Sequence, residues 1–122
     1  MPQILVIDDE LPVRMLLRQI LEGEGYEVRE ANDGEEGMHA LYEAPADLVI
    51  TDIFMPNQEG IETIRIVRQQ FPQIKLLAIS GGGVRKMMDV LPAAKQFGAH
   101  LTLMKPFTPG ELLNAVTAVL GA

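Results

Sequence analysis

Acidic, hydroxyl and ammonium side chains directly follow four short apolar runs in this 122-residue chain. Asp8 and Asp9 follow the run ILVI, Asp52 follows LVIT, Ser80 follows LLAI and Lys105 follows LTLM. In an open sheet of parallel strands, ligands bind beyond the carboxyl ends of the strands. If these runs are parallel strands of one sheet, three carboxylates, one hydroxyl and one ammonium meet at the same edge.

Three carboxylates at one edge need a positive partner. Two of them about 5 Å apart repel by roughly 3 kcal/mol at an effective dielectric constant of about 20. A hard divalent cation relieves this repulsion, and Mg²⁺ binds a few carboxylates together with water and phosphate oxygens. A carboxylate beside such a cation can attack phosphorus and form an aspartyl phosphate. Lys105 would then offer a positive charge, and Ser80 a hydrogen-bond donor, to the phosphoryl oxygens.

The elements that must position these groups alternate along the chain. Strands are expected over Ile4–Ile7, Tyr26–Ala31, Leu48–Ile50, Leu76–Ile79 and Leu101–Met104. Helices are expected after each of them, because apolar residues recur there at three- and four-residue spacing. Helix starts are indicated by Pro12, by Asp33 with Glu36, and by Thr108 with Glu111. The helix after the glycine triplet that follows Ser80 is less regular and is expected to end near Gly98. Five such units imply one α/β domain over residues 1–122, with a parallel sheet covered by helices on both faces.

Composition and charge exclude several classes of protein. The net charge of −7 disfavours direct contact with nucleic acid or an anionic membrane. The absence of cysteine excludes disulfides, thiol nucleophiles and thiolate zinc sites, and with only His39 and His100 a site of several histidines is not expected. The N-terminus does not resemble a signal peptide, and no apolar run approaches the ~20 residues that cross a bilayer. We therefore expect a soluble, cytoplasmic protein.

Four segments, ILVIDDE, VITDIFMP, LLAISG and LMKPF, occur in this order at a suitable spacing. Together they resemble the receiver domain of two-component response regulators, and the likeness extends over residues 2–122. The resemblance implies a flavodoxin-like doubly wound fold, with five strands in the order 2-1-3-4-5. It also implies that Asp52 accepts a phosphoryl group from a sensor histidine kinase or a histidine phosphotransfer protein. The phosphorylated, stand-alone domain would then change its binding to a downstream protein in trans.

The resemblance further implies a role for each residue of the site. The Mg²⁺ ligands would be Asp9, Asp52 and the backbone carbonyl of Phe54, with Asp8 holding the ion through water. Ser80 and Lys105 would contact the phosphoryl oxygens, and the peptide bond between Lys105 and Pro106 would be cis. The chain would promote its own Mg²⁺-dependent phosphorylation and dephosphorylation without turning over an external substrate.

Three departures from the family pattern bear on the switch. The family usually has Tyr or Phe three residues before the lysine, where this chain has Thr102. No large ring can change its rotamer there, so we expect phosphorylation to reorder the longer, glycine-rich loop, mainly over residues 81–88. Phe54 and Gly82 flank the expected mouth of the site and offer no polar side chain to hold an attacking water. We therefore expect slow loss of the phosphoryl group from Asp52.

Alternative interpretations remain open at this level. The acidic pair Asp8 and Asp9 could merely favour the positive end of the following helix, Asp52 could be a turn residue, and Lys105 could belong to an ordinary loop. A receiver-like binding module that no longer uses phosphate is one rival function. A small phosphohydrolase with an aspartyl-phosphate intermediate is another, although such enzymes usually carry a second Asp where this chain has Phe54.

Overall fold

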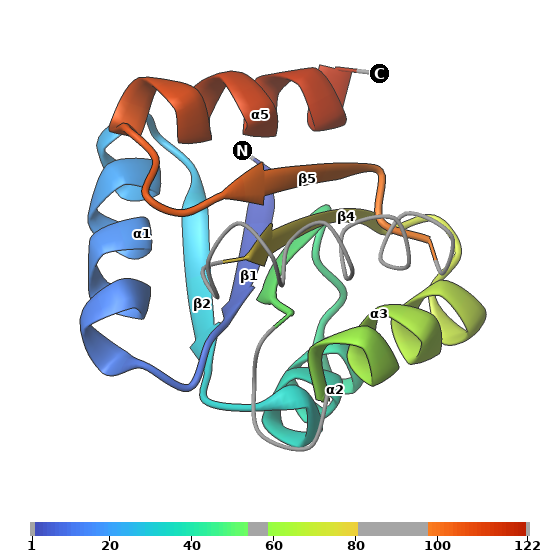
Figure 1. Cartoon of the computed structure of the whole chain (residues 1–122). Coiled ribbons are helices and arrows are strands. Elements are labelled where there is room, and N and C mark those ends of the chain that lie inside the picture. Colours follow the sequence, from blue (N-terminus) through green and yellow to red (C-terminus); the bar gives the residue numbers. More distant parts are fainter. Residues whose placement is uncertain (1, 54–58, 81–97, 122) are drawn as a thin grey trace.

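The computed structural model describes residues 2–53, 59–80 and 98–121 (Figure 1). The elements in chain order are β1 (Gln3–Ile7), α1 (Leu11–Gly23), β2 (Glu27–Ala31), α2 (Gly34–Glu43), β3 (Leu48–Asp52), α3 (Glu59–Gln70), β4 (Lys75–Ser80), β5 (Leu101–Met104) and α5 (Pro109–Gly121). These five strands and four helices confirm the elements expected over the described residues. The expected helix ending near Gly98 falls almost entirely on residues 81–97, outside the described part of the chain.

The five strands form one sheet in the order β2-β1-β3-β4-β5. Every neighbouring pair is parallel, which confirms the predicted doubly wound α/β fold and its strand order. Because all strands run in the same direction, their carboxyl ends lie at a single edge of the sheet. The carboxyl ends of β1, β3, β4 and β5 therefore lie side by side.

Helices cover both faces of the sheet, with α1 and α5 on one face and α2 and α3 on the other (Figure 1). Alternation along β1 divides the apolar core between these faces. Leu5 and Ile7 pack with residues of α2 and α3, whereas Ile4 and Val6 pack with residues of α1 and α5. Central strands buried on both faces read as continuous apolar runs, and this is why ILVI stands out in the sequence.

Two predicted helix starts have the hydrogen bonds that their sequence indicates. At α2, Asp33 accepts from the Glu36 backbone N–H at 2.8 Å, and Glu36 in turn accepts from the Asn32 N–H at 3.0 Å. At α5, Thr108 Oγ1 accepts from the Glu111 N–H at 3.1 Å, and Glu111 Oε1 accepts from the Thr108 N–H at 2.9 Å. These bonds satisfy backbone donors that the first turn of a helix leaves unpaired.

No helix within the described ranges is both long and apolar enough to cross a lipid bilayer.

Candidate functional site

The carboxyl edge of the sheet gathers an acidic cluster from two neighbouring strands. Asp8, Asp9 and Glu10 follow β1, and Asp52 ends β3. One carboxylate oxygen from each of these four residues lies within 4.8 Å of the others. Asp8 is 1% exposed and Asp52 is 4% exposed, while Asp9 and Glu10 face solvent. The prediction that the strand-end carboxylates converge is therefore confirmed.

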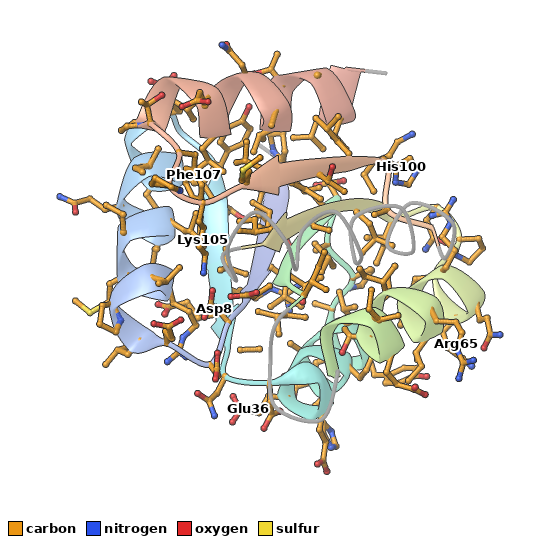
Figure 2. All side chains as sticks on the ribbon, viewed as in Figure 1. Asp8, Glu36, Arg65, His100, Lys105 and Phe107 are labelled. Carbon is orange, nitrogen blue, oxygen red and sulfur yellow. The ribbon has the colours of Figure 1, made fainter. Side chains whose placement is uncertain are left out.

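Lys105 brings a positive charge to this cluster from the end of β5 (Figure 2). Its Nζ donates a hydrogen bond to Asp52 Oδ2 at 2.9 Å and lies 3.5 Å from Asp8 Oδ2. The ammonium thus links carboxylates from β1 and β3, although Lys105 is 97 residues from Asp8 in the chain. The peptide bond between Lys105 and Pro106 is cis, as the sequence resemblance implies.

Asp8 is held at both its backbone and its carboxylate. Its N–H donates to Ala31 O at 3.2 Å, which extends the pairing of β1 with β2. Its Oδ1 accepts from the Glu10 N–H at 2.8 Å, and its Oδ2 faces Lys105. Burial raises the pKa of Asp8 to about 6, because desolvation and the nearby Asp52 outweigh the Glu10 N–H and the Lys105 charge.

Lys105 keeps its proton despite its partial burial. Desolvation alone would lower the pKa of Lys105, but the hydrogen bond and charge of Asp52, with the charges of Asp8 and Glu10, raise it above its ordinary value. A permanently charged ammonium at this position can balance negative charge that arrives beside Asp52.

The remaining predicted site residues are placed only in part. The backbone of Ser80 ends β4 opposite Met104 of β5, at the same edge of the sheet, but the contacts of its hydroxyl lie outside what is described. Thr102 is half-buried in β5 opposite Ala78. Phe54, Gly82 and the loop over 81–88, on which the expectations about the mouth and the switch depend, lie outside the described residues.

Gly60 is a site residue that the sequence analysis missed. It lies in the first turn of α3, and a Cβ at this position would collide with backbone atoms of Asp52 and Ile53. The close approach fixes α3 directly against the chain that leaves β3. A glycine inside a helical pattern is the signal that could have identified this contact.

The donor set fits a hard divalent cation. Its members among the described residues are carboxylates, which are the ligands that Mg²⁺ prefers in proteins. Asp9 and Glu10 are exposed and leave the cluster open to solvent, so an ion and a phosphoryl group can reach it.

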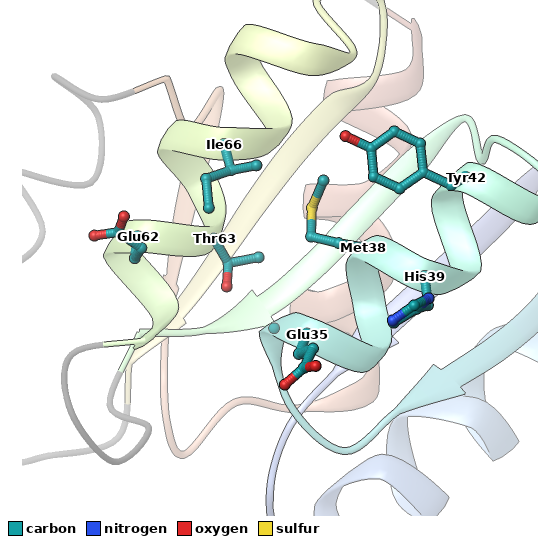
Figure 3. A pocket seen from close by; sticks show the side chains of 8 residues that line it. Glu35, Met38, His39, Tyr42, Glu62, Thr63 and Ile66 are labelled. Carbon is teal, nitrogen blue, oxygen red and sulfur yellow. The ribbon is translucent and has the colours of Figure 1, made fainter.

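A separate hollow of about 370 Å³ lies between α2 and α3 (Figure 3). Its lining consists of Gly34, Glu35, Met38, His39, Tyr42, Glu62, Thr63 and Ile66. None of these residues belongs to the strand-end cluster, and we assign the hollow no part in the chemistry of the site.

Comparison with known proteins gives one consistent answer. The family model described as the response regulator receiver domain matches residues 4–117. Chemotaxis protein CheY of Thermotoga maritima is 35% identical over 118 residues, covering 96% of this chain and 96% of that protein. The crystal structure of the receiver domain of NtrX from Brucella abortus superimposes with a TM-score of 0.91 at 30% identity, covering 98% of each chain.

A longer relative matches over only part of its length. Transcriptional regulatory protein ResD of Bacillus subtilis is 35% identical over 119 residues, which are 97% of this chain and 48% of that protein. The chain therefore spans about half the length of this transcriptional regulator and nearly all of the CheY relative.

Proposed function

The chain belongs to the response regulator receiver domains, the phosphorylation-controlled switches of two-component signalling, and from this premise we propose that Asp52 is its phosphoacceptor. The observation that carries the proposal is the Lys105–Asp52 ion pair beside the buried Asp8, at the meeting point of three strands. The proposed phosphodonor is a sensor histidine kinase or a histidine phosphotransfer protein. The whole of residues 1–122 acts as this one domain.

In the proposed reaction, a carboxylate oxygen of Asp52 forms a bond to phosphorus as the bond from phosphorus to the donor's histidine nitrogen breaks. Lys105 orients this carboxylate before the reaction and balances the charge of the phosphoryl oxygens during it. Asp9 and Asp52 would hold Mg²⁺, with Asp8 acting through water and Phe54 through its carbonyl, and the ion supplies further positive charge for the phosphoryl oxygens. Ser80 donates its hydroxyl to the same oxygens.

Little beyond position and charge is needed for this transfer. The chain promotes its own phosphorylation and dephosphorylation with these groups and does not turn over an external substrate. A phosphohydrolase would need a general acid near Asp52, and the usual position of that acid is occupied by Phe54. A phosphate-independent binding module would have no use for a lysine between two buried carboxylates.

An apolar surface beside the site supports a docking position for the phosphodonor. Leu11, Met15 and Leu16 of α1 are each more than half exposed, and all three line a hollow of about 690 Å³ along this helix. Leu16 also lines a second hollow, of about 400 Å³, together with Lys105. Because the second hollow includes Lys105, which bonds to Asp52, a phosphodonor bound over α1 would have a short path to Asp52.

Labelling with a small phosphodonor tests the proposal without the unknown kinase. Wild-type chain incubated with acetyl phosphate and Mg²⁺ should gain one phosphoryl group by intact mass, and the gain should disappear when EDTA replaces Mg²⁺. Asp52→Asn should abolish the gain because an amide is a poor nucleophile. Asp47→Asn is the matched control, since Asp47 lies just before the opposite end of β3 and accepts a hydrogen bond from the Gln3 N–H; it should label like the wild type. Absence of label on the wild type would favour the phosphate-independent module.

A further inference from the structure

Arg14 of α1 contacts the acidic loop, residues 8–10 between β1 and α1, and is held by three acceptors. Its Nη1 donates to Asp8 O at 2.6 Å and to Asn32 Oδ1 at 3.1 Å, and its Nε donates to Glu30 Oε1 at 3.2 Å. The side chain is only 13% exposed. A planar guanidinium with several donors in a fixed arrangement can bond to acceptors on different segments at once, and here it joins the end of β1 to the end of β2.

The bond to Asp8 O fixes one particular peptide group. That carbonyl belongs to the link between Asp8 and Asp9, so its direction determines where the chain places the Asp9 side chain. The other atoms of Asp8 are fixed by Ala31 O and by the Glu10 N–H. Those two bonds do not fix the peptide group between Asp8 and Asp9. Arg14 restrains this group through its bond to the Asp8 carbonyl.

We propose that Arg14 is a positioning residue: the fork of hydrogen bonds that it donates to Glu30, Asn32 and the Asp8 carbonyl holds the acidic loop in the shape that binds the divalent cation. The inference rests on the proposed function for its metal and extends it to a residue outside the ligand set. Arg14 acts through the backbone between Asp8 and Asp9 and touches neither the ion nor the phosphoryl group.

The positive charge of Arg14 and its hydrogen bonds to the loop predict opposite changes in Mg²⁺ affinity when Arg14 is replaced. A positive charge near a cation site opposes cation binding, so loss of the charge alone would strengthen the binding of Mg²⁺. Loss of the restraint would weaken it, because partners that orient metal ligands contribute about 10- to 100-fold in metal affinity. The direction of the change therefore separates the two roles.

Arg18 provides a matched control on the same helix. Its Nη1 donates to the same Glu30 carboxylate at 2.9 Å and its Nε donates to Glu22 at 3.1 Å, so neither of these bonds reaches the acidic loop. Arg18→Gln and Arg14→Gln thus each remove one positive charge and one ion pair with Glu30. Only Arg14→Gln releases the Asp8 carbonyl.

Two measurements from amide NMR spectra test the proposal on the full chain. In a titration with MgCl₂, Arg14→Gln should bind about tenfold more weakly than the wild type, while Arg18→Gln should stay within about twofold of it. In metal-free protein, solvent exchange of the Glu10 amide, which donates to Asp8, should accelerate in Arg14→Gln and not in Arg18→Gln. Unchanged or tighter Mg²⁺ binding by Arg14→Gln, or equal losses in both variants, would overturn the proposal.

The exchange measurement also separates this inference from the proposed function. If the wild type binds no Mg²⁺, the proposed metal site fails, while the Glu10 amide still reports whether Arg14 holds the loop.

Arg14→Lys covers the case in which Arg14→Gln does not fold. A single ammonium cannot span Glu30, Asn32 and the Asp8 carbonyl, so this variant should show weaker Mg²⁺ binding and faster exchange; wild-type behaviour in both would show that the fork is not needed.

Discussion

Replacing Asp8 by asparagine should stabilise the metal-free protein while removing a group that the proposed metal site needs. Asp8 is a buried carboxylate that faces Asp52 across Lys105. Asparagine keeps an oxygen that can accept from the Glu10 N–H, as Asp8 Oδ1 does, and it brings no charge into the buried site. The stabilisation measures the folding free energy that the ionised carboxylate of Asp8 costs the metal-free protein.

The magnitude follows from the pKa of Asp8, which burial raises from an ordinary value of 3.8 to about 6. The difference corresponds to about 3 kcal/mol of folding free energy when the carboxyl is ionised in both the folded and the unfolded chain. Below pH 3.8 the group is protonated in both states and costs nothing. As the pH rises, the unfolded chain loses its proton first, so the cost grows until the folded carboxyl ionises near pH 6, and it is constant above that.

Urea unfolding in EDTA, followed by circular dichroism, measures this effect. The advantage of Asp8→Asn over the wild type should approach about 3 kcal/mol at pH 7.5 and shrink steadily as the pH is lowered from 6 toward 4. Asp9→Asn makes the same chemical change at an exposed neighbour and should alter stability much less. Adding Mg²⁺ should stabilise the wild type by mass action and Asp8→Asn much less. A variant less stable than the wild type at pH 7.5, or an advantage independent of pH, would refute the reasoning.

Three further predictions concern docking, packing and pH. Met15→Glu should slow phosphoryl transfer from a histidine kinase domain at least about tenfold, because a charge replaces an exposed apolar contact, and should leave labelling by acetyl phosphate unchanged. Gly60→Ala should lower the free energy of unfolding by about 1–3 kcal/mol and slow labelling, because the new methyl group displaces the Asp52 backbone. Burial lowers the pKa of His100, whose Nδ1 accepts from the Leu76 N–H, so the wild type should lose stability relative to His100→Asn as the pH falls below 6.5.

Each of these predictions has a control and a contradicting result. Tyr42→Glu changes another exposed apolar side chain, on α2, and should not slow the kinase reaction; equal slowing in both variants would contradict the proposed docking surface. Gly23→Ala adds a methyl group with no atom within 4 Å, and a loss of stability equal to that of Gly60→Ala would contradict the packing argument. Parallel pH profiles for the wild type and His100→Asn would show that His100 does not contribute.

The sequence predicted the fold well because several local signals agreed. The buried strands β1 and β3 appear as continuous apolar runs. The helix starts were indicated by Asp33 and Thr108, whose side-chain oxygens accept hydrogen bonds from backbone N–H groups of the first turn. The convergence of Asp8, Asp52 and Lys105 followed from parallel strands alone, since residues that end such strands share one edge.

The features that the sequence did not predict depend on contacts between distant segments. Nothing local marks Arg14 as different from Arg18, because the distinction is that only Arg14 reaches the Asp8 carbonyl. Nothing local indicates that the ring of His100, which precedes β5, accepts a hydrogen bond from the backbone of β4, 24 residues away in the chain. A glycine inside a helical pattern marks Gly60 as unusual, but the backbone atoms of Asp52 and Ile53 that it must accommodate are brought beside it only by the fold.

Locating the phosphoryl group tests the central claim, that Asp52 is the phosphoacceptor, most directly. Wild-type chain is labelled with acetyl phosphate and Mg²⁺ and then reduced with borohydride, which converts an aspartyl phosphate into homoserine that peptide fragmentation can place. We predict homoserine at position 52 in the wild type and none in Asp52→Asn. Homoserine in place of Asp8 or Asp9, or undiminished labelling of Asp52→Asn, would contradict the assignment.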